Sequence, residues 1–246
     1  MATHFDLNIT SYEEAISVER QDNGLFTVHT KDRRGQENHH VAKYVVIATG
    51  YFDHPNYIGI PGEELPKVTH YFREAHPYTG TKVAIIGGSN SAVDAALELI
   101  RVGAEVTVIY RGETISNNIK PWVRPLFESL VNKGNIHLHL DSRVTEIKED
   151  AIVITTKEGQ ETIVDNDFVL AMTGFHPDRQ LLASSGVQLG GDMEKPVFNP
   201  DTMESSVPGL YVAGVIASGS NANEVFIETG RVHGRLIAEH IRPIHN

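Results

Sequence analysis

The segment from Lys82 to Tyr110 constrains the fold more than any other part of this 246-residue sequence. It begins with an apolar run over 82–86, continues through a glycine-rich turn, and then shows apolar residues at the i, i+3, i+4 and i+7 spacing of a helix. Gly103 is typical of a helix C-terminal cap, and a second apolar strand is predicted over 105–110. Strand, helix and strand in this order form a right-handed βαβ unit, so the sequence predicts an α/β fold with a parallel sheet.

The turn between this strand and this helix matches the dinucleotide-binding fingerprint G-x-G-x-x-G/A except at one position. Gly87 permits the tight turn, and Ala92 is small enough for close packing of helix on strand. Ser89 stands where the second glycine is usual, which slightly obstructs the approach of a pyrophosphate. Because N–H groups at the start of a helix favour an anion, we still expect dinucleotide binding rather than a purely structural turn. The residues expected at the pyrophosphate are Gly87, Gly88, Ser89, Asn90 and Ser91.

The end of the second strand favours NADPH over NADH. NAD-selective sites place an acidic residue there to bond the ribose 2′-hydroxyl, whereas this sequence has Tyr110-Arg111-Gly112. A guanidinium pairs with a 2′-phosphate through a charge-assisted fork, so we expect Arg111 to hold that phosphate. Lys120 and Arg124 lie nearby in the sequence and would add positive charge. The alternative is that Arg111 is an ordinary solvated arginine.

Further apolar patterns predict strands on both sides of this unit. Alternation predicts strands over 5–10, 15–19 and 25–30, and the Asp-Asn-Gly sequence at 22–24 predicts a hairpin between the last two. Residues 53–80 are rich in Pro, His and Gly and predict a connection with at most one short helix. The remaining predicted elements are strands at 44–50, 136–140, 168–174 and 209–214, a hairpin within 150–164, and helices at 121–133 and 224–242.

Composition excludes several classes of function. The chain has no cysteine, so it supplies no disulfide, no cysteine-ligated metal and no thiol nucleophile. Its 21 basic and 32 acidic residues give a net charge of −11, which argues against a nucleic-acid partner. No stretch approaches the ~20 apolar residues that span a bilayer, so we expect no membrane partner and a soluble, cytoplasmic protein. The histidine pairs at 39–40 and 137–139 lack a third ligand at recognisable spacing, so we expect no metal site.

Four motifs in one order resemble those of thioredoxin-reductase-like flavoproteins, which have two dinucleotide-binding domains. The four are the first Thr-Gly strand at 46–50, the turn at 87–92, the second Thr-Gly element at 172–177 and the late segment at 208–214. The bacillithiol-disulfide-reductase subgroup resembles the chain most, through residues 69–78 and 221–228. The resemblance extends from about Phe5 to the C-terminus.

The resemblance implies an α/β protein with tandem Rossmann-like domains for FAD and NAD(P). We expect an NADPH-binding domain over 53–173 and a split FAD-binding domain over 1–52 and 174–246. The family begins with a strand, a glycine-rich turn and a helix that bind the FAD pyrophosphate. No counterpart precedes Phe5, so we expect the FAD domain to be N-terminally incomplete.

Two further departures concern the active site. Thioredoxin reductases proper carry Cys-x-x-Cys before the NADPH strand, and here His70 and Arg73 fall at those positions. The late FAD motif usually ends Gly-Asp, whereas this chain has Gly214-Val215, a form that the bacillithiol subgroup shares. We expect no general acid, base or nucleophile, because the flavin carries the electron chemistry.

The resemblance also implies roles at FAD. A helix starting near Glu224 would aim its N-terminus at the flavin ring, where a positive dipole stabilises the reduced flavin. Gly214 and Val215 would approach the flavin side chain. The residues expected at FAD are Thr49, Gly50, Gly174, Gly214, Val215, Glu224 and Val225.

The implied function is NADPH-dependent reduction of a low-molecular-weight thiol disulfide, bacillithiol disulfide, by an FAD-containing oxidoreductase. We expect this chain alone to be inactive because its FAD domain is incomplete. One alternative is a thioredoxin-reductase-like ferredoxin– or flavodoxin–NADP reductase, which acts on a small redox protein. Another is an NADPH-binding module without catalysis. Open sheet edges in the incomplete domain predict a homo-oligomer.

Overall fold

The chain folds into two compact units in a computed structural model that describes residues 3–52, 54–192, 194–221 and 224–242. One unit, called the split unit, consists of residues 1–54 and 175–246, and the other is the 55–174 unit. Asp53, at a predicted domain boundary, and Ala222 and Asn223, in a predicted motif, lie outside the described residues.

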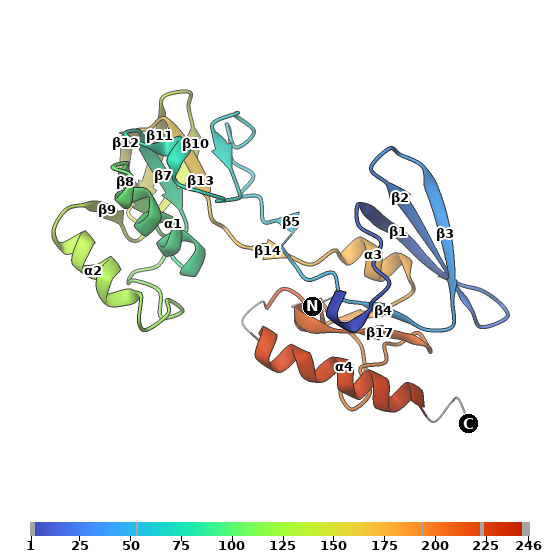
Figure 1. The fold of residues 1–246 in the computed structure, drawn as a ribbon. Helices are drawn as coiled ribbons and strands as arrows, with labels where there is room; N and C mark the ends of the chain where they lie inside the picture. The colour runs from blue at the N-terminus through green and yellow to red at the C-terminus, as the bar shows by residue number, and fades with distance from the viewer. Residues whose placement is uncertain (1–2, 53, 193, 222–223, 243–246) are drawn as a thin grey trace. The chain divides into compact units, whose positions relative to one another are not determined.

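The 55–174 unit contains a parallel sheet, two helices and a smaller antiparallel sheet (Figure 1). Its elements are β6 (Val68–Thr69), η2 (His76–Tyr78), β7 (Lys82–Ile86), α1 (Asn90–Arg101), β8 (Glu105–Ile109), α2 (Arg124–Asn132), β9 (Ile136–His139), β10 (Ser142–Ile147), β11 (Ala151–Thr156), β12 (Glu161–Asp165) and β13 (Phe168–Ala171). The parallel strands lie in the order β6-β13-β7-β8-β9, and β10-β11-β12 form the antiparallel sheet. The predicted βαβ unit is therefore β7, α1 and β8.

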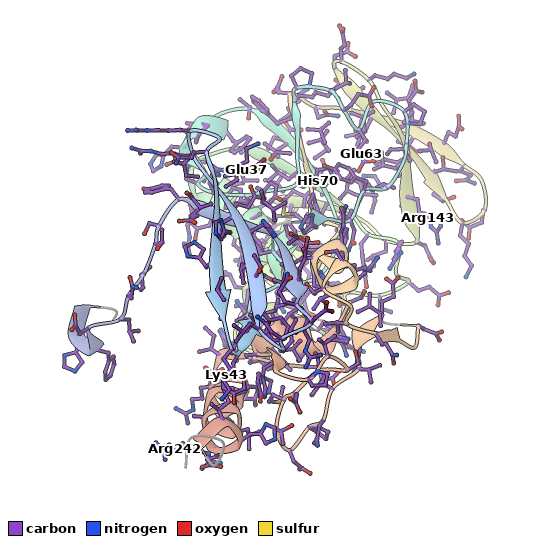
Figure 2. All side chains as sticks on the ribbon, turned by 90° about the vertical axis from the view of Figure 1, so that its right-hand side faces the viewer. Glu37, Lys43, Glu63, His70, Arg143 and Arg242 are labelled. Carbon is purple, nitrogen blue, oxygen red and sulfur yellow. The ribbon has the colours of Figure 1, made fainter. Side chains whose placement is uncertain are left out.

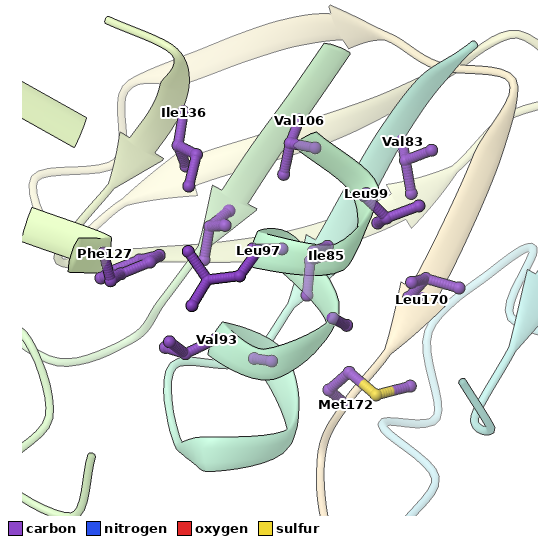
Figure 3. Close-up of a cluster of buried hydrophobic side chains, with 14 of the residues drawn as sticks. Val83, Ile85, Val93, Leu97, Leu99, Val106, Phe127, Ile136, Leu170 and Met172 are labelled. Atoms are coloured by element: carbon purple, nitrogen blue, oxygen red, sulfur yellow. The ribbon is translucent and has the colours of Figure 1, made fainter. Parts of the chain in front are cut away.

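The two faces of the parallel sheet are covered by different layers. Val83 and Ile85 of β7 belong to the cluster that includes α1 residues, and Figure 3 shows Leu99 of α1 beside these two side chains. Ala84, the intervening residue of β7, belongs instead to a second cluster with residues of β10 and β11. Because successive side chains of a strand point to opposite faces, this division explains why β7 is apolar at every buried position.

The split unit holds the remaining elements, with β5 (His54–Pro55) at the boundary. They are η1 (Thr3–Phe5), β1 (Glu13–Arg20), β2 (Phe26–Asp32), β3 (Glu37–Ala42), β4 (Val45–Ile47), β14 (Phe175–His176), α3 (Arg179–Ser184), β15 (Leu189–Gly190), β16 (Lys195–Pro196), β17 (Leu210–Val212), η3 (Gly214–Ser218) and α4 (Ile227–Ile241). Strands β1-β2-β3 form an antiparallel sheet, and β4 pairs in parallel with β17.

The core of the split unit gathers around β17. Tyr211 is fully buried, and its hydroxyl lies 2.9 Å from Nδ1 of His240 on α4. Burial, with the nearby Glu204 charge, raises the pKa of Tyr211 to about 12, so the hydroxyl stays protonated at neutral pH. This contact fixes α4 against the parallel strand pair.

The structure corrects several predicted bounds. Residues 5–10 form no strand, and Phe5, Leu7 and Ile9 stay 62%, 58% and 59% exposed because no neighbouring strand pairs with them. The last helix begins at Ile227 rather than Glu224. The predicted strand at 44–50 ends at Ile47, and Gly50 has a φ of +76°, a left-handed conformation outside the strand region. Strands β3 and β10 and helix α3 were not predicted from the sequence.

Candidate nucleotide-binding site

The turn after β7 is closed by contacts on both sides of Gly87. Gly87 has a φ of +137°, and a Cβ there would lie 2.4 Å from the carbonyl oxygen of Met172, which follows β13. The Gly87 N–H donates to the carbonyl of Ile109 at the end of β8, at 2.9 Å. Both the positive φ and the lack of room for a Cβ therefore require glycine at position 87. The turn lies where the strand order changes direction, between β7 and β13, and open α/β sheets bind ligands at such a point.

Gly88 is required for a different reason, the ring of Tyr110. A Cβ on Gly88 would lie 2.3 Å from Cγ of Tyr110, and a Cβ on Gly112 would lie 2.5 Å from Cε1 of the same ring. The ring therefore packs between two glycines directly after β8. Sequence reasoning missed Tyr110 as part of this site, although Gly112, two residues further on, and the glycine turn were both visible in the sequence.

The start of α1 presents backbone amides but uses one side chain to hold a loop. Ser89, the N-cap residue, makes no side-chain capping hydrogen bond. The Asn90 side chain accepts from the Lys120 N–H at 2.9 Å and donates to the Asn118 carbonyl at 2.8 Å. Ser91 is exposed in the first turn. The positive end of the helix dipole thus remains available to an anion, while Asn90 orders the loop that follows β8.

The three basic residues predicted near a 2′-phosphate have different environments. Lys120 Nζ lies 3.0 Å from Oδ2 of Asp94 on α1. Arg124 Nε lies 2.7 Å from Oε1 of Glu128, and its Nη1 donates to Asn117. Arg111 is exposed, and its side chain forms no ion pair or hydrogen bond with the described residues. Arg111 is therefore the cation of the three whose charge is left for a ligand.

His139 on β9 adds no positive charge to this edge of the sheet. Burial lowers the pKa of His139, and the neighbouring His137 lowers it further, so His139 is neutral at neutral pH. Its carbonyl accepts from the Tyr110 N–H at 2.8 Å, which ties β9 to the site. Over the described residues, no three His, Asp or Glu side chains group together as metal ligands would.

Four residues predicted at FAD gather at one end of the parallel pair in the split unit. Thr49 and Gly50 follow β4, and Gly214 and Val215 follow β17. Because parallel strands end at the same sheet edge, and the Ala213 N–H donates to the Ile47 carbonyl at 3.0 Å, the two segments lie side by side. A Cβ on Gly50 or Gly214 would meet no atom within 4 Å, so open space adjoins both glycines.

Helix α4 holds the second of these segments. Nδ1 of His233 accepts from the Gly214 N–H at 3.1 Å. Burial lowers the pKa of His233, which keeps Nδ1 free of a proton and able to accept. The Gly214 amide is thus already used by the protein, a contact that sequence reasoning did not find.

The other residues predicted at FAD are Glu224, Val225 and Gly174. Glu224 Oε2 pairs with Nζ of Lys195 at 2.5 Å. Val225 precedes α4 and lies near Gly214, since a Cβ at Gly230 would be 3.2 Å from Cγ1 of Val225 and 3.4 Å from Cα of Gly214. Gly174 belongs to the 55–174 unit, where it follows β13 with a φ of +90°.

A profile of the pyridine nucleotide-disulphide oxidoreductase family matches residues 1–214. The chain belongs to this family. It is 50% identical over 222 residues to the bacilliredoxin reductase Bdr of Bacillus subtilis, a match that covers 90% of this chain and 67% of the relative. The predicted resemblance to thioredoxin-reductase-like flavoproteins is confirmed at the level of the family and of this relative.

Solved structures of other proteins agree with the fold. The bacillithiol disulfide reductase Bdr (YpdA) of Bacillus cereus is 47% identical, with a TM-score of 0.94, and the match covers 98% of this chain and 74% of that one. A thioredoxin reductase of T. acidophilum, 24% identical with a TM-score of 0.73, matches 97% of this chain and 76% of its own and shares the fold. The predicted α/β, Rossmann-like fold is confirmed.

Other relatives carry a different activity in their names. A ferredoxin–NADP reductase of Ignicoccus hospitalis is 31% identical over 211 residues, which cover 83% of this chain and 66% of the relative. The chain thus spans about two thirds of the length of each of these two curated relatives. In the described part of this family member, no helix is long and apolar enough to cross a membrane.

Proposed function

We propose that the 55–174 unit binds NADPH. The observation that carries this proposal is the turn of Gly87 and Gly88 at the strand reversal, followed by the uncapped start of α1. Arg111 would hold the 2′-phosphate, because its charge is not neutralised by a neighbour as those of Lys120 and Arg124 are. Lys120 would contribute by ordering the loop rather than by direct charge.

We further propose that the split unit contributes to an FAD site. The open space beside Gly50 and Gly214, at the shared end of β4 and β17, supports a close approach of a ligand to the backbone there. Bound FAD would supply the electron transfer between nicotinamide and a disulfide. This chain's own residues would position it: Thr49 and Val215 flank the two glycines, and His233 holds the Gly214 segment.

The substrate that we propose is a low-molecular-weight thiol disulfide, bacillithiol disulfide, reduced in the cytoplasm. The support is the 47% and 50% identity to proteins named bacillithiol disulfide reductase and bacilliredoxin reductase. A ferredoxin– or flavodoxin–NADP reductase is the second candidate, favoured by the 31% identity to a reductase of that name.

A chimera tests the substrate. We would join the part of the Bacillus subtilis relative that this chain does not match to the 246 residues, add FAD, and measure NADPH oxidation. Turnover with bacillithiol disulfide is expected, and no such turnover in the 246 residues alone. If the chimera instead reduces ferredoxin or flavodoxin with the higher specificity constant, the second candidate replaces the first. The full-length Bacillus relative serves as the positive control.

A further inference from the structure

The segment that begins at Asn56 is bonded to the carboxyl end of β13. The Asn56 N–H donates to the Gly174 carbonyl at 2.9 Å, and the Thr173 hydroxyl donates to the Asn56 carbonyl. The preceding residue, Met172, is the one whose carbonyl closes on Gly87. A continuous set of contacts therefore leads from the glycine turn through β13 to Asn56, and Tyr57 is the next residue.

The strand order indicates which half of a bound dinucleotide would lie on the β13 side of the sheet. A dinucleotide lies across the reversal point, here between β7 and β13, with one nucleotide on each side. Arg111, proposed to hold the 2′-phosphate of the adenosine half, follows β8 on one side. The nicotinamide half therefore belongs on the side of β13, where Asn56 and Tyr57 are tied.

Tyr57 is an exposed aromatic residue on an anchored backbone. Tyr57 is 72% exposed. The backbone that follows it is nevertheless held, because the N–H groups of Ile58 and Gly59 donate to the carboxylate of Glu63 at 2.7 to 3.0 Å. Glu63 is itself only 8% exposed. A buried carboxylate thus fixes the turn that presents the Tyr57 ring.

A buried histidine contacts the Tyr57 ring. The rings of Tyr57 and His70 meet edge to face with centroids 4.7 Å apart. His70 is 9% exposed, neither ring nitrogen has a hydrogen-bond partner within the described residues, and Nε2 lies 3.6 Å from Glu63 (Figure 2). Glu63 therefore fixes the backbone beside Tyr57 and His70 contacts its ring, while most of the Tyr57 surface stays exposed.

We propose that Tyr57 contacts the nicotinamide ring of NADPH and that Glu63 and His70 are positioning residues for it. The inference rests on the proposed NADPH site in the same unit. A nicotinamide ring is flat and aromatic, and an offset or edge contact with a tyrosine suits such a partner. A tyrosine that is exposed but rigidly held loses little conformational entropy when the contact forms, which favours its use in binding.

Two ligands separate this contact from the rest of the site. NADPH has the nicotinamide ring, whereas 2′,5′-ADP retains the adenosine half and the 2′-phosphate but lacks that ring. Calorimetry on the 246-residue chain would give the affinity for each. Tyr57→Ala is expected to weaken NADPH binding about three- to tenfold and leave 2′,5′-ADP binding unchanged, since aromatic pairs contribute on that scale. Tyr57→Phe should retain wild-type affinity for both.

The positioning role of Glu63 is tested by comparing the affinities for NADPH and 2′,5′-ADP, because a damaged fold would weaken the binding of both ligands. Glu63→Gln keeps one acceptor oxygen for the Ile58 and Gly59 amides, and Glu63→Ala keeps none. We expect the NADPH affinity to fall in the order wild type, Glu63→Gln, Glu63→Ala, with 2′,5′-ADP affinity constant in all three. Tyr12→Ala, an exposed tyrosine of the split unit, is the matched control and should change neither affinity.

The outcomes distinguish this inference from the function on which it rests. Equal loss of both ligands in Tyr57→Ala, or an unchanged NADPH affinity, overturns the nicotinamide contact. Failure of the wild-type chain to bind either ligand overturns the proposed NADPH site itself.

Discussion

At the scale of single residues, Gly88 lies within a nucleotide-binding motif but is required by the packing of a neighbouring side chain. The fingerprint leaves this position open, and sequence reasoning placed Gly88 at the pyrophosphate by its neighbours alone. The Tyr110 ring occupies the space where a Cβ would be, at 2.3 Å. The glycine is therefore needed for the fold of the turn whether or not a nucleotide is bound.

Gly88→Ala should accordingly destabilise the protein by ~1–3 kcal/mol, the usual cost of overpacking. The measurement is the denaturant midpoint of unfolding. Tyr110→Ala added to Gly88→Ala should recover part of the loss, because it removes the clashing ring. Gly234→Ala, in α4 with nothing near its Cβ and no left-handed φ, is the matched control and should stabilise by ~0.4–1 kcal/mol. Equal midpoints for Gly88→Ala and wild type would contradict the packing.

At the scale of elements, regular hydrophobic patterns were enough to predict the βαβ unit and much of the sheet. Strand β7, helix α1 and strand β8 follow the predicted order. The apolar residues that each of them buries are spaced in its sequence as that type of element requires. Residues 5–10 carry the same kind of alternation but have no partner strand, so the pattern alone misleads. Strand pairing depends on distant residues, which a local pattern does not contain.

The glycine turn of the candidate site was predictable because its backbone geometry requires a known motif. The contacts between side chains that are distant in the sequence were not predictable. Glycine at 87 follows from the fingerprint, but the pairing of Lys120 with Asp94 joins residues 26 positions apart. The Tyr57, Glu63 and His70 group likewise depends on a turn within 53–80, which shows little regular structure. These contacts arise from the path of loops, for which the sequence carries no periodic signal.

The contact of α4 with the Gly214 segment predicts a pH dependence. The folded state lowers the pKa of His233 below its ordinary 6.5, because burial opposes the charge. The unfolded chain therefore binds the proton more readily, and the free energy of unfolding should decrease as pH falls below about 6.5. His233→Asn supplies an acceptor oxygen for the Gly214 N–H but does not titrate.

Urea unfolding between pH 8 and pH 5 measures this effect. We expect the stability of His233→Asn to fall less steeply with decreasing pH than that of the wild type, while His233→Ala, which loses the acceptor, is less stable at every pH. His139, whose pKa is also lowered by burial, should leave part of the slope in all three proteins. Identical slopes for wild type and His233→Asn would refute the assigned role.

At the scale of the whole molecule, the split unit leaves apolar surface uncovered. Val46 on β4 is 46% exposed, and Ile227 and Val232 on α4 are 87% and 39% exposed. The pair of β4 and β17 is a sheet of two strands, which is marginal by itself. We therefore predict that a second copy of the chain covers this surface.

Light scattering tests that prediction. The expected mass is a multiple of the 27.1 kDa chain, and Val46→Glu should shift the mass towards a single chain by placing a charge in the contact. Glu161→Gln, on the exposed strand β12 of the other unit, is a control that should not alter the mass. A monomeric wild-type protein would contradict the prediction.

The central claim is that the 55–174 unit binds NADPH at its glycine turn and prefers it to NADH through Arg111. Calorimetric titration of the chain with NADPH and then with NADH tests it most directly, with Arg111→Ala as the paired variant. We predict tighter binding of NADPH by about tenfold or more, since hydrogen bonds to charged groups contribute ~1.5–3 kcal/mol, and loss of that preference in Arg111→Ala. Equal affinity of the wild-type chain for the two nucleotides, or a preference that survives Arg111→Ala, would contradict the claim.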